Sequence, residues 1–384
     1  MNRDPLETMT IGVEEEYLLV DTRTMDLADD PPDTLLSECE ARMPNQVTPE
    51  LMRSQIEVGT KVCHSMQDVR EQLANLRQVI RDVANSHGLA PIAAATHPFA
   101  RWTDQKPTSR ARYATLSSEL QGIGRQLVTC GMHVHVGVEN PELRIDLMNQ
   151  LKYFLPHILA FSTSSPFWDS QKTGLMCYRL SVFDRLPRTG LGEYFESFAQ
   201  YERYVDVMVN SGLVTDTSKL WWDLRPNARF PTLEMRVTDI CTHIDDAVAV
   251  AALYVCLARR LIRLRTENQK WRAYALSLIK ENRWRAQRYG LDDGLVDFGK
   301  SKVIDWSDLL NEMLDLIHED AVALQCEDEV NHLRTILERG TSAHWQLRTF
   351  ETAIANGATQ EEALKEVVSM LVRETEVGLP QSMG

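Results

Sequence analysis

The chain has 384 residues, which is enough for one large domain or two ordinary ones. Its hydrophobic (43%) and charged (25%) fractions are typical of a globular protein, and its formal net charge of −14 disfavours nucleic acid as a partner. No segment is apolar and long enough to span a membrane, the N-terminus has no apolar signal core, and the seven cysteines form no CxxC pair. We therefore expect a cytoplasmic protein with reduced thiols and no membrane partner.

The first predicted element is a strand over residues 11–21, which is rich in Val, Leu and Tyr and is interrupted by three carboxylates. Alternate residues of a strand share a face, so Glu14 and Glu16 point one way and Glu15 the other. Two carboxylates on one face repel each other, so a cation should lie above them. Either a Lys or Arg partner or a divalent metal ion would serve.

A second acidic segment, residues 50–62, is also expected to be extended, with Glu57 on the same face as Gln55 and Arg53. Glu50 and Glu57 are an odd number of residues apart, so a bend near Met52 is needed if both serve one site. The neighbouring segments predict a short helix at 33–42, an amphipathic helix at 66–87 and a strand at 90–95.

Residues 129–139 alternate almost perfectly between apolar side chains and others. On the less apolar face, His133 and His135 are flanked by Gly131 and Gly137, which leave room for a bulky group. The two imidazoles are either hydrogen-bonded structural residues or ligands of a metal ion or substrate. Helices are expected on both sides of this strand, at 108–128 and at 141–163, and Pro156 should kink the second.

Two strands are predicted within residues 220–239, around a turn at 226–227. Arg225 lies on the first strand, on a face shared with Trp221 and Asp223, and Glu234 and Arg236 share a face of the second. Before these strands, the segment 176–187 carries Arg179, and a helix is expected at 193–210.

From residue 244 onward the pattern is helical, over roughly 245–266, 268–287, 304–318, 321–339, 342–356 and 359–376. One strongly basic run lies in this part, at residues 282–290, and it includes Arg283 and Arg288. It is either a solvated helix end or an anion-binding patch.

The predicted strands share one property: each has an apolar side that helices can cover and a side with ionisable groups. The second sides offer Glu14, Glu16, Glu57, His133, His135, Glu234 and Arg236. Such residues cannot form a dry core, so together they form a wet surface or a site. Carboxylates with histidines suit Mg²⁺ or Mn²⁺, and two or more such ions beside an arginine are what ATP phosphoryl transfer needs. No Walker or G-x-G-x-x-G motif is present, so metal ions and arginines would have to hold the ATP.

Several segments resemble, in the same order, the carboxylate–amine ligases of the glutamate–cysteine ligase type 2 family. They are GVEEE at 12–16, THPF at 96–99, GMHVHVG at 131–137, WDLRP at 222–226, EMRVTD at 234–239 and NRWRAQRYG at 282–290. The resemblance implies a glutamine-synthetase-like α+β fold, in which helices back a curved antiparallel sheet with an open concave active-site face. It also implies ATP-dependent activation of a carboxylate as an acyl phosphate that an amine then attacks. Glutamate plus cysteine is the family's reference reaction, and it is weak in many members.

The resemblance also implies roles for individual residues. Metal ligands for two or more Mg²⁺ or Mn²⁺ ions would be Glu14, Glu16, Glu57, His133 and Glu234, with Glu50 a weaker candidate. Arg236 and Glu234 would be catalytic, with Arg236 near the transferred phosphate. Substrate or ATP contacts would come from Thr96, His97, His135, Arg179 and Arg225, and further phosphate contacts from Arg283 and Arg288. Ala95 stands where the family usually has Gly, which puts the shape of the substrate loop in question.

Other readings stay open. His133 and His135 also suggest a metal-dependent hydrolase of the amidohydrolase type, which would require an alternating β/α barrel. A non-catalytic small-molecule-binding relative would keep the fold without turnover. If the charges only paired with one another, Arg53, Arg225 and Arg236 would have to balance at least five carboxylates.

We expect one catalytic domain over residues 1–384, with a helical C-terminal part from about residue 244. The partners expected are small-molecule substrates: glutamate or another carboxylate, and cysteine or another amine. The apolar stripes of the C-terminal helices suggest a homo-oligomer, in the first place a dimer.

Overall fold

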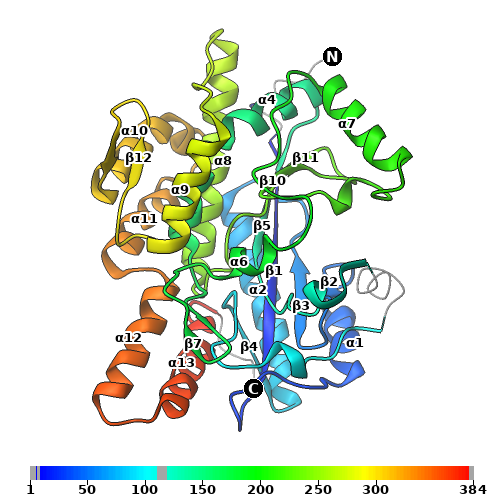
Figure 1. Ribbon diagram of the computed structural model, residues 1–384, viewed down its shortest axis with the longest axis vertical. Helices are drawn as coiled ribbons and strands as arrows, with labels where there is room; N and C mark the ends of the chain where they lie inside the picture. Colours follow the sequence, from blue (N-terminus) through cyan, green and yellow to red (C-terminus); the bar gives the residue numbers. More distant parts are fainter. Residues whose placement is uncertain (1–5, 7–8, 110–118, 380–384) are drawn as a thin grey trace.

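A computed structural model describes residue 6, residues 9–109 and residues 119–379 of the chain. An antiparallel sheet runs through the centre, and the C-terminal helices stand along one side of it (Figure 1). Among the helices described, none is long and apolar enough to cross a membrane. The expected α+β class, with an antiparallel sheet and a helical C-terminal part, is confirmed.

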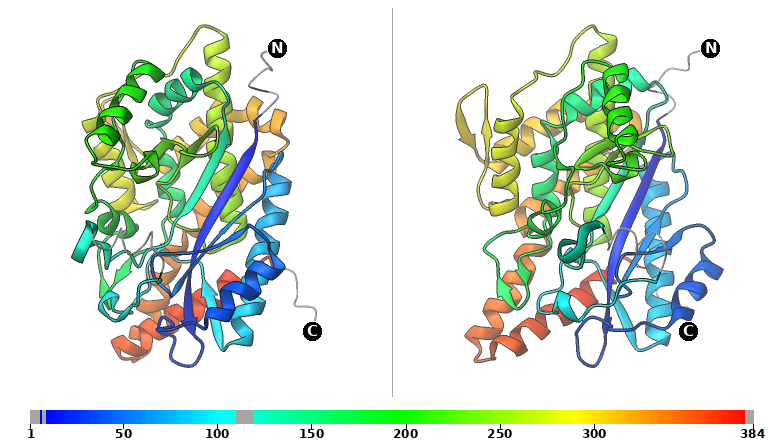
Figure 2. Two further views of the ribbon diagram at one scale, coloured as in Figure 1. Left: turned by 90° about the vertical axis from the view of Figure 1, so that its right-hand side faces the viewer. Right: turned by 45° about the vertical axis from the view of Figure 1, so that its right-hand side comes forward.

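The main sheet contains seven strands within the described residues, and all of its pairs are antiparallel. The strand order is β10 (Leu224–Pro226), β11 (Thr232–Met235), β5 (Met132–Gly137), β1 (Ile11–Asp21), β3 (Gln55–Gly59) and β2 (Val47–Pro49), and β4 (Leu89–Ile92) pairs with the second half of β1. The long strand β1 therefore has three partners, and Figure 2 shows it running beside β5.

Smaller elements surround the sheet. The helices are α1 (Asp33–Arg42), α2 (Met66–Ser86), α4 (Pro141–Leu151), α5 (Leu155–Ser162), α6 (Arg179–Phe183), α7 (Phe198–Asn210), α8 (Ile244–Thr266), α9 (Leu276–Tyr289), α10 (Trp306–Leu324), α11 (Glu327–Arg339), α12 (Ser342–Ala355) and α13 (Gln360–Thr375). Two short 3₁₀ turns are η1 (Trp102–Asp104) and η2 (Thr217–Lys219). Three two-stranded sheets pair β6 (Phe167–Trp168) with β7 (Gln171–Lys172), β8 (Thr189–Gly190) with β9 (Trp221–Trp222), and β12 (Leu295–Asp297) with β13 (Lys302–Ile304).

One face of the main sheet is covered by α2, which packs on β1 and β4, and by α8, which packs on β5. The helix α2 starts at a capping box, in which the Ser65 hydroxyl accepts from the Asp68 N–H and the Asp68 carboxylate accepts from the Ser65 N–H. Its apolar stripe, which includes Leu73 and Ile80, is fully buried. The buried apolar side chains form one core cluster that reaches from β1 to α13. This shared core supports the single-domain organisation, which stays a prediction.

The other face of the sheet carries the ionisable residues, as the alternation predicts. In β1, Val13, Glu15 and Tyr17 are buried while Glu14 and Glu16 are partly exposed on the opposite side. Side chains that face each other in a strand pair lie on the same side of the sheet. The register places Glu14 opposite His133, Glu16 opposite Glu57, His135 opposite Glu234, and Arg225 opposite Glu234. The bend near Met52 is present too, where Gln55 N–H donates to the Met52 carbonyl at 3.0 Å.

The structure corrects the predicted continuous helix at 141–163. It contains two helices, α4 and α5, separated by a turn over Lys152–Phe154. Pro156 lies in the first turn of α5, where its missing N–H is not needed. In a continuous helix its ring would clash with the carbonyl of Lys152, so the chain breaks instead of bending.

Other boundaries also differ from the prediction. The helix expected at 193–210 begins only after Ser197, whose hydroxyl accepts from the Gln200 N–H and caps it. The helix expected at 268–287 begins at Leu276, and the strand expected around Trp221 divides into β9 and β10, which belong to different sheets. Of the helix expected at 108–128, residues 110–118 lie outside the described part; residues 119–124 are helical and 125–128 are not.

The barrel that the hydrolase reading requires is contradicted. A barrel of that type alternates strands with helices and has only parallel strand pairs. The main sheet here is antiparallel throughout the described residues, and the helices that follow β11 are interrupted only by the antiparallel pair β12–β13.

Candidate active site

Glu14 lies between the two histidines of β5. Its Oε2 atom is 3.2 Å from Nδ1 of His133, and its Oε1 atom is 3.3 Å from Nε2 of His135. Burial opposes ionisation of this carboxyl, but the hydrogen bonds and charges of the two imidazoles outweigh it and hold the pKa of Glu14 well below its usual value. Glu14 is therefore a permanent anion at the centre of the face.

The pKa values of the two histidines are shifted in opposite directions. At His135, burial is outweighed by the hydrogen bond and charge of Glu14, and the pKa is raised. At His133, burial and the nearby Arg236 cation lower the pKa. Glu14 thus favours the protonated form of His135, whereas His133 is neutral at pH 7, which is the form in which histidine binds a metal ion.

Glu16 lies beside the free end of His133. Its Oε2 atom accepts from the Gly131 N–H at 2.6 Å, and its Oε1 atom is 3.7 Å from Nε2 of His133. Nε2 of His133 and Nε2 of His135 are both buried, and neither makes a well-aligned hydrogen bond to a described residue. In the tautomer of His133 that donates from Nδ1 to Glu14, Nε2 keeps a lone pair next to Glu16. A buried nitrogen lone pair beside a carboxylate lacks a positively charged partner such as a metal ion.

Glu57 extends the acidic cluster onto β3, the strand that flanks β1 on the edge opposite β5. Its carboxyl is hydrogen-bonded to that of Glu50, and burial together with the charges of Glu50, Glu14 and Glu16 raises its pKa well above the usual value. Burial also raises the pKa of Glu50. The two carboxyls therefore share a proton, because both cannot be ionised this close together. The weaker candidate Glu50 thus lies in the cluster.

Glu234 is the most strongly held carboxylate of the face. Arg225 donates to both of its oxygens, at 3.0 and 3.1 Å, Arg236 donates to Oε1 at 2.5 Å, and Asn227 Nδ2 donates to Oε2 at 2.8 Å. Burial opposes ionisation, but the two arginines dominate and hold the pKa of Glu234 well below its usual value. Each oxygen accepts two hydrogen bonds, so a metal ion bound here would have to displace one of them.

Arg236 lies between Glu234 and His133. Its Nη1 atom is 3.3 Å from Nδ1 of His133, and its buried Nε–H has no hydrogen-bond partner among the residues that the structure describes. Burial opposes its charge, but Glu234 outweighs burial and raises the pKa, so the guanidinium stays ionised. A fixed cation with an unused donor beside carboxylates suits the charged oxygens of a phosphoryl group.

The residues present fit a divalent metal ion. Ligand atoms of Glu14, His135 and Glu234 lie within 4.8 Å of one another, and Glu16 and His133 adjoin them. Carboxylate oxygens with imidazole nitrogens and no thiolate suit Mg²⁺ or Mn²⁺.

The alternative in which the charges only pair with one another fails for a specific reason. Arg53, one of its three arginines, forms ion pairs with Asp30 and Asp33. The other two arginines, Arg225 and Arg236, both bind the same carboxylate, Glu234.

Arg179 packs against the backbone of two strand segments that carry site residues. Its two terminal nitrogens donate to the carbonyl of Arg236, at 3.3 Å each, and it is only 2% exposed. A Cβ atom at Gly131 would come within 2.3 Å of this guanidinium, so any other residue there would have to displace Arg179. The structure thus places Arg179 against two strand ends that carry site residues.

Thr96 and His97 are buried, and their side chains form hydrogen bonds with nearby backbone groups. The Thr96 hydroxyl donates to the Phe167 carbonyl at 2.7 Å, His97 Nε2 lies 3.0 Å from the Met25 carbonyl, and His97 Nδ1 accepts from the Ala100 N–H at 2.9 Å. Burial lowers the pKa of His97 to about 3. The structure does not bring these two side chains into contact with the carboxylates, and their role as substrate contacts stays a prediction.

The two arginines of the basic run are also placed apart from the carboxylate cluster. Arg283 is buried and paired with Asp223 at 2.7 Å and Asp184 at 2.6 Å, so its charge is already balanced. Arg288 lies over the ring of Tyr289, 4.9 Å from its centroid. Phosphate binding by either residue stays a prediction.

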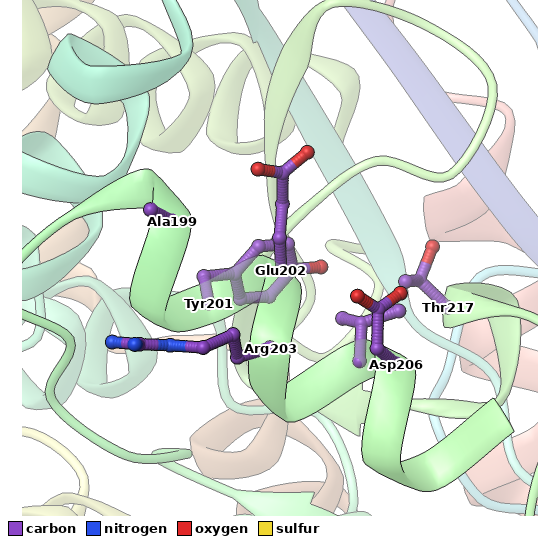
Figure 3. A pocket seen from close by; sticks show the side chains of 7 residues that line it. Ala199, Tyr201, Glu202, Arg203, Asp206 and Thr217 are labelled. Atoms are coloured by element: carbon purple, nitrogen blue, oxygen red, sulfur yellow. The ribbon is translucent and has the colours of Figure 1, made fainter. Parts of the chain in front are cut away.

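A surface cavity of about 520 Å³ lies along α7 and η2 (Figure 3). It is lined by Ala199, Tyr201, Glu202, Arg203, Val205, Asp206 and Thr217. None of the predicted site residues is among them, so this cavity is separate from the candidate site.

The family model described as "Glutamate-cysteine ligase family 2(GCS2)" matches residues 10–370. The chain belongs to this family. Its members are ATP-dependent carboxylate–amine ligases, so the ligase reading is confirmed at that level. A protein of Rhodospirillum rubrum named "Putative glutamate--cysteine ligase 2" is 55% identical over 386 residues, covering 100% of this chain and 99% of its own. A protein of the same name from Jannaschia sp. is 48% identical, covering 97% and 98%.

Solved structures share the fold. The glutamate–cysteine ligase of Francisella tularensis, solved in complex with AMP, matches with a TM-score of 0.69 at 14% identity and covers 97% of this chain and 90% of its own. A bifunctional glutathione synthetase from Pasteurella multocida matches with a TM-score of 0.66 at 13% identity, covering 97% of this chain and 53% of its own. At these identities the likeness shows the fold, which is that of glutamate–cysteine ligases.

Sequence reasoning missed two contributors to the site. Asn227, expected only as a turn residue, donates to Glu234, and Glu15, expected only to point to the opposite face, forms a buried ion pair with Arg77. The alternation of β1 places Glu15 on the apolar side, and a charge on a buried face requires a partner. That rule predicts a cationic partner for Glu15. It does not identify Arg77, because the two residues are far apart in the sequence.

Proposed function

We propose that this protein uses ATP to join a carboxylate to an amine through an acyl phosphate, on the face of the sheet that carries Glu14, Glu16, His133, Glu234 and Arg236. A carboxylate oxygen attacks the γ-phosphorus of ATP and displaces ADP. The amine nitrogen then attacks the acyl carbon, the C–O bond to phosphate breaks, and the amine loses its protons to solvent or a base. The products are an amide, ADP and phosphate.

The observation that carries the proposal is the incomplete cluster around His133 and Glu16. Five carboxyls, including the Glu50–Glu57 pair, gather near one neutral histidine whose Nε2 is unpaired. We propose that Glu14, Glu16, Glu57, His133 and Glu234 hold two or more Mg²⁺ or Mn²⁺ ions. Bound ions would neutralise the phosphate charge during transfer.

The protein's own residues would then position the substrates. Arg236 would bind oxygens of the transferred phosphoryl group, since it is fixed by Glu234 and keeps an unused donor. His135 would hold Glu14 in place and contact the nucleotide, while Arg225 keeps Glu234 ionised. Preorganised charges of this kind act without reorganisation cost during reaction.

For the substrates, we propose L-glutamate as the carboxylate and L-cysteine as the reference amine, following the names of the relatives. A homodimer in the cytoplasm remains the expected form. The test is ADP release from purified protein with ATP, Mg²⁺ or Mn²⁺, L-glutamate and a panel of amines. Release that requires both a carboxylate and an amine supports the proposal, whereas release that is indifferent to the amine contradicts it.

A further inference from the structure

The backbone of Arg236 is held by a hydrogen bond on each of its two polar groups. The residue lies one position beyond the end of β11, outside the paired register of that strand. Its N–H donates to the Asp223 carbonyl at 2.8 Å, and its carbonyl accepts from both terminal nitrogens of Arg179 at 3.3 Å each. The direction in which the Arg236 guanidinium leaves the chain therefore depends on Asp223 and Arg179.

Asp223, which connects β9 to β10, is in turn held by Arg283 of α9. Its buried carboxylate accepts from Nε of Arg283 at 2.7 Å and from Nη2 at 3.1 Å. Its N–H donates to the Gly190 carbonyl at 2.8 Å. A planar guanidinium that binds both oxygens of a carboxylate fixes its orientation as well as its position. The residue that holds the Arg236 N–H is thus itself immobilised from α9.

The short helix α6 closes these contacts into a ring. Arg179 is its first residue, and Asp184 is the residue that caps its C-terminal end. The Asp184 carboxylate accepts from Nη1 of Arg283 at 2.6 Å and from Nη2 at 3.0 Å. From Arg236 the ring passes through Arg179 and α6 to Asp184. It then returns through Arg283 and Asp223 to Arg236, so the two hydrogen bonds on the Arg236 backbone are linked to each other.

The charges of the ring balance without a ligand. Apart from Arg236, whose counter-ion is Glu234, the ring contains two guanidinium groups and two carboxylates. Burial opposes the charge of Arg283, but its two carboxylate partners outweigh burial and raise its pKa. A guanidinium has five N–H donors, and Arg283 makes four hydrogen bonds to these carboxylates, so at most one donor remains. Binding a phosphate would break contacts that the buried carboxylate of Asp223 needs.

We propose that Arg283 and Asp223 are positioning residues of the ligase reaction. They fix the backbone of Arg236, so that its guanidinium is aimed at the phosphoryl group before the reaction begins. This inference rests on the proposed function, in which Arg236 binds the transferred phosphoryl group, and it gives Arg283 a role other than phosphate contact. Because a preorganised cation acts mainly in the transition state, loosening the ring lowers kcat and leaves KM for ATP unchanged.

The test compares ADP release by wild type, Asp223→Asn and Arg283→Lys, with ATP, Mn²⁺, L-glutamate and L-cysteine. Asp223→Asn should lower kcat about 10- to 100-fold, the effect of a misplaced catalytic group, without changing KM for ATP. Arg283→Lys keeps the charge but loses the fork that holds both carboxylates, so it should lower kcat by a smaller factor. A rise in KM for ATP with unchanged kcat in Arg283→Lys would make Arg283 a nucleotide contact and overturn the inference.

The control variant is Asp320→Asn. Asp320 is also fully buried and paired with two arginines, Arg259 and Arg263, but these pairs join α10 to α8. This variant should lose stability as Asp223→Asn does, yet keep the wild-type kcat. Equal kcat values for the folded Asp223→Asn and Asp320→Asn variants would reduce the ring to a structural role.

Two further measurements separate this inference from the proposed function. In an Arg236→Lys background, Asp223→Asn should lower kcat far less than in wild type, because the guanidinium that it positions is already gone; equal factors overturn the inference while the ligase stands. Absence of ADP release from wild type overturns the proposed function instead. Hydrogen exchange at residues 232–239, measured by mass spectrometry, then decides on the ring: faster exchange in Asp223→Asn than in Asp320→Asn supports it, and equal exchange overturns it.

Discussion

The side chains of Glu15 and Arg77 form a bidentate ion pair, 0% and 1% exposed, on the face of β1 opposite Glu14 and Glu16. Arg77 also donates to the carbonyls of Thr242 and Cys241, at 2.7 and 3.0 Å. The pair thus ties β1 to α2 and to the segment that follows β11. It fixes the relative position of the strands that carry the candidate site.

Glu15→Gln should lower the free energy of unfolding by about 3–5 kcal/mol, because it leaves the Arg77 charge buried without its counter-ion. Urea denaturation followed by circular dichroism measures this. The matched control is Arg23→Ala, which removes the exposed partner of Asp21 and should leave the free energy of unfolding nearly unchanged. The double variant Glu15→Leu/Arg77→Met should recover part of the loss. Equal stability of Glu15→Gln and Arg23→Ala would contradict this account.

Lys152 should make the stability depend on pH. It is fully buried, its ammonium donates to the Glu193 carbonyl, and burial lowers its pKa to about 7. An amine whose pKa is lower in the folded state binds its proton more weakly there, so stability rises with pH once the folded form has lost the proton. Between pH 7 and 9 the free energy of unfolding should rise by up to about 1.4 kcal/mol per pH unit.

The check is urea denaturation at several pH values with Lys152→Met, in which this rise should disappear. Lys302→Met, at an exposed position, should keep the wild-type dependence. A rise that persists in Lys152→Met would assign it to another group.

Mn²⁺ should raise the melting temperature of the wild-type protein, and a chelator should reverse the change, because binding to the folded state alone stabilises it. Glu57→Gln should show a smaller shift, since it removes a proposed ligand. Without metal it should be more stable than wild type, because the mutual repulsion of Glu57, Glu14 and Glu16 is relieved. Glu366→Gln, at an exposed position, should match wild type in both respects. Equal Mn²⁺ shifts in all three proteins would remove Glu57 from the site.

The thiols should be unreactive in the native protein. All seven cysteines are buried, and burial raises the pKa of Cys130, Cys177 and Cys241 well above the usual value. A thiol-specific reagent that forms mixed disulfides should therefore label no cysteine rapidly in the folded protein. It should label all seven cysteines after unfolding. Ser277→Cys, which places a thiol at an exposed position, should add one fast-reacting group. Fast labelling of the wild type with loss of turnover would show that a cysteine serves the site.

The composition of the candidate face could be predicted from sequence, because the two-residue period of β1 and β5 decides which side chains share a side. The register could not, since it depends on pairings between strands more than a hundred residues apart, such as Glu14 with His133. For the same reason, the clamp of Arg225 and Arg236 on one carboxylate was not foreseen. The helix boundaries depended on local details, namely the cap at Ser197 and the carbonyl that Pro156 would strike.

The measurement that tests the central claim most directly is ADP release by wild type and Glu16→Ala, with ATP, Mn²⁺, L-glutamate and L-cysteine. Within the described part of the chain, Glu16 accepts one hydrogen bond, from Gly131, and it belongs to a like-charge cluster, so its removal should leave the fold intact. The account predicts release that requires glutamate, amine and metal in wild type, and loss of release in Glu16→Ala with an unchanged circular dichroism spectrum. Equal turnover by a folded Glu16→Ala would show that this face of the sheet is not the ligase centre.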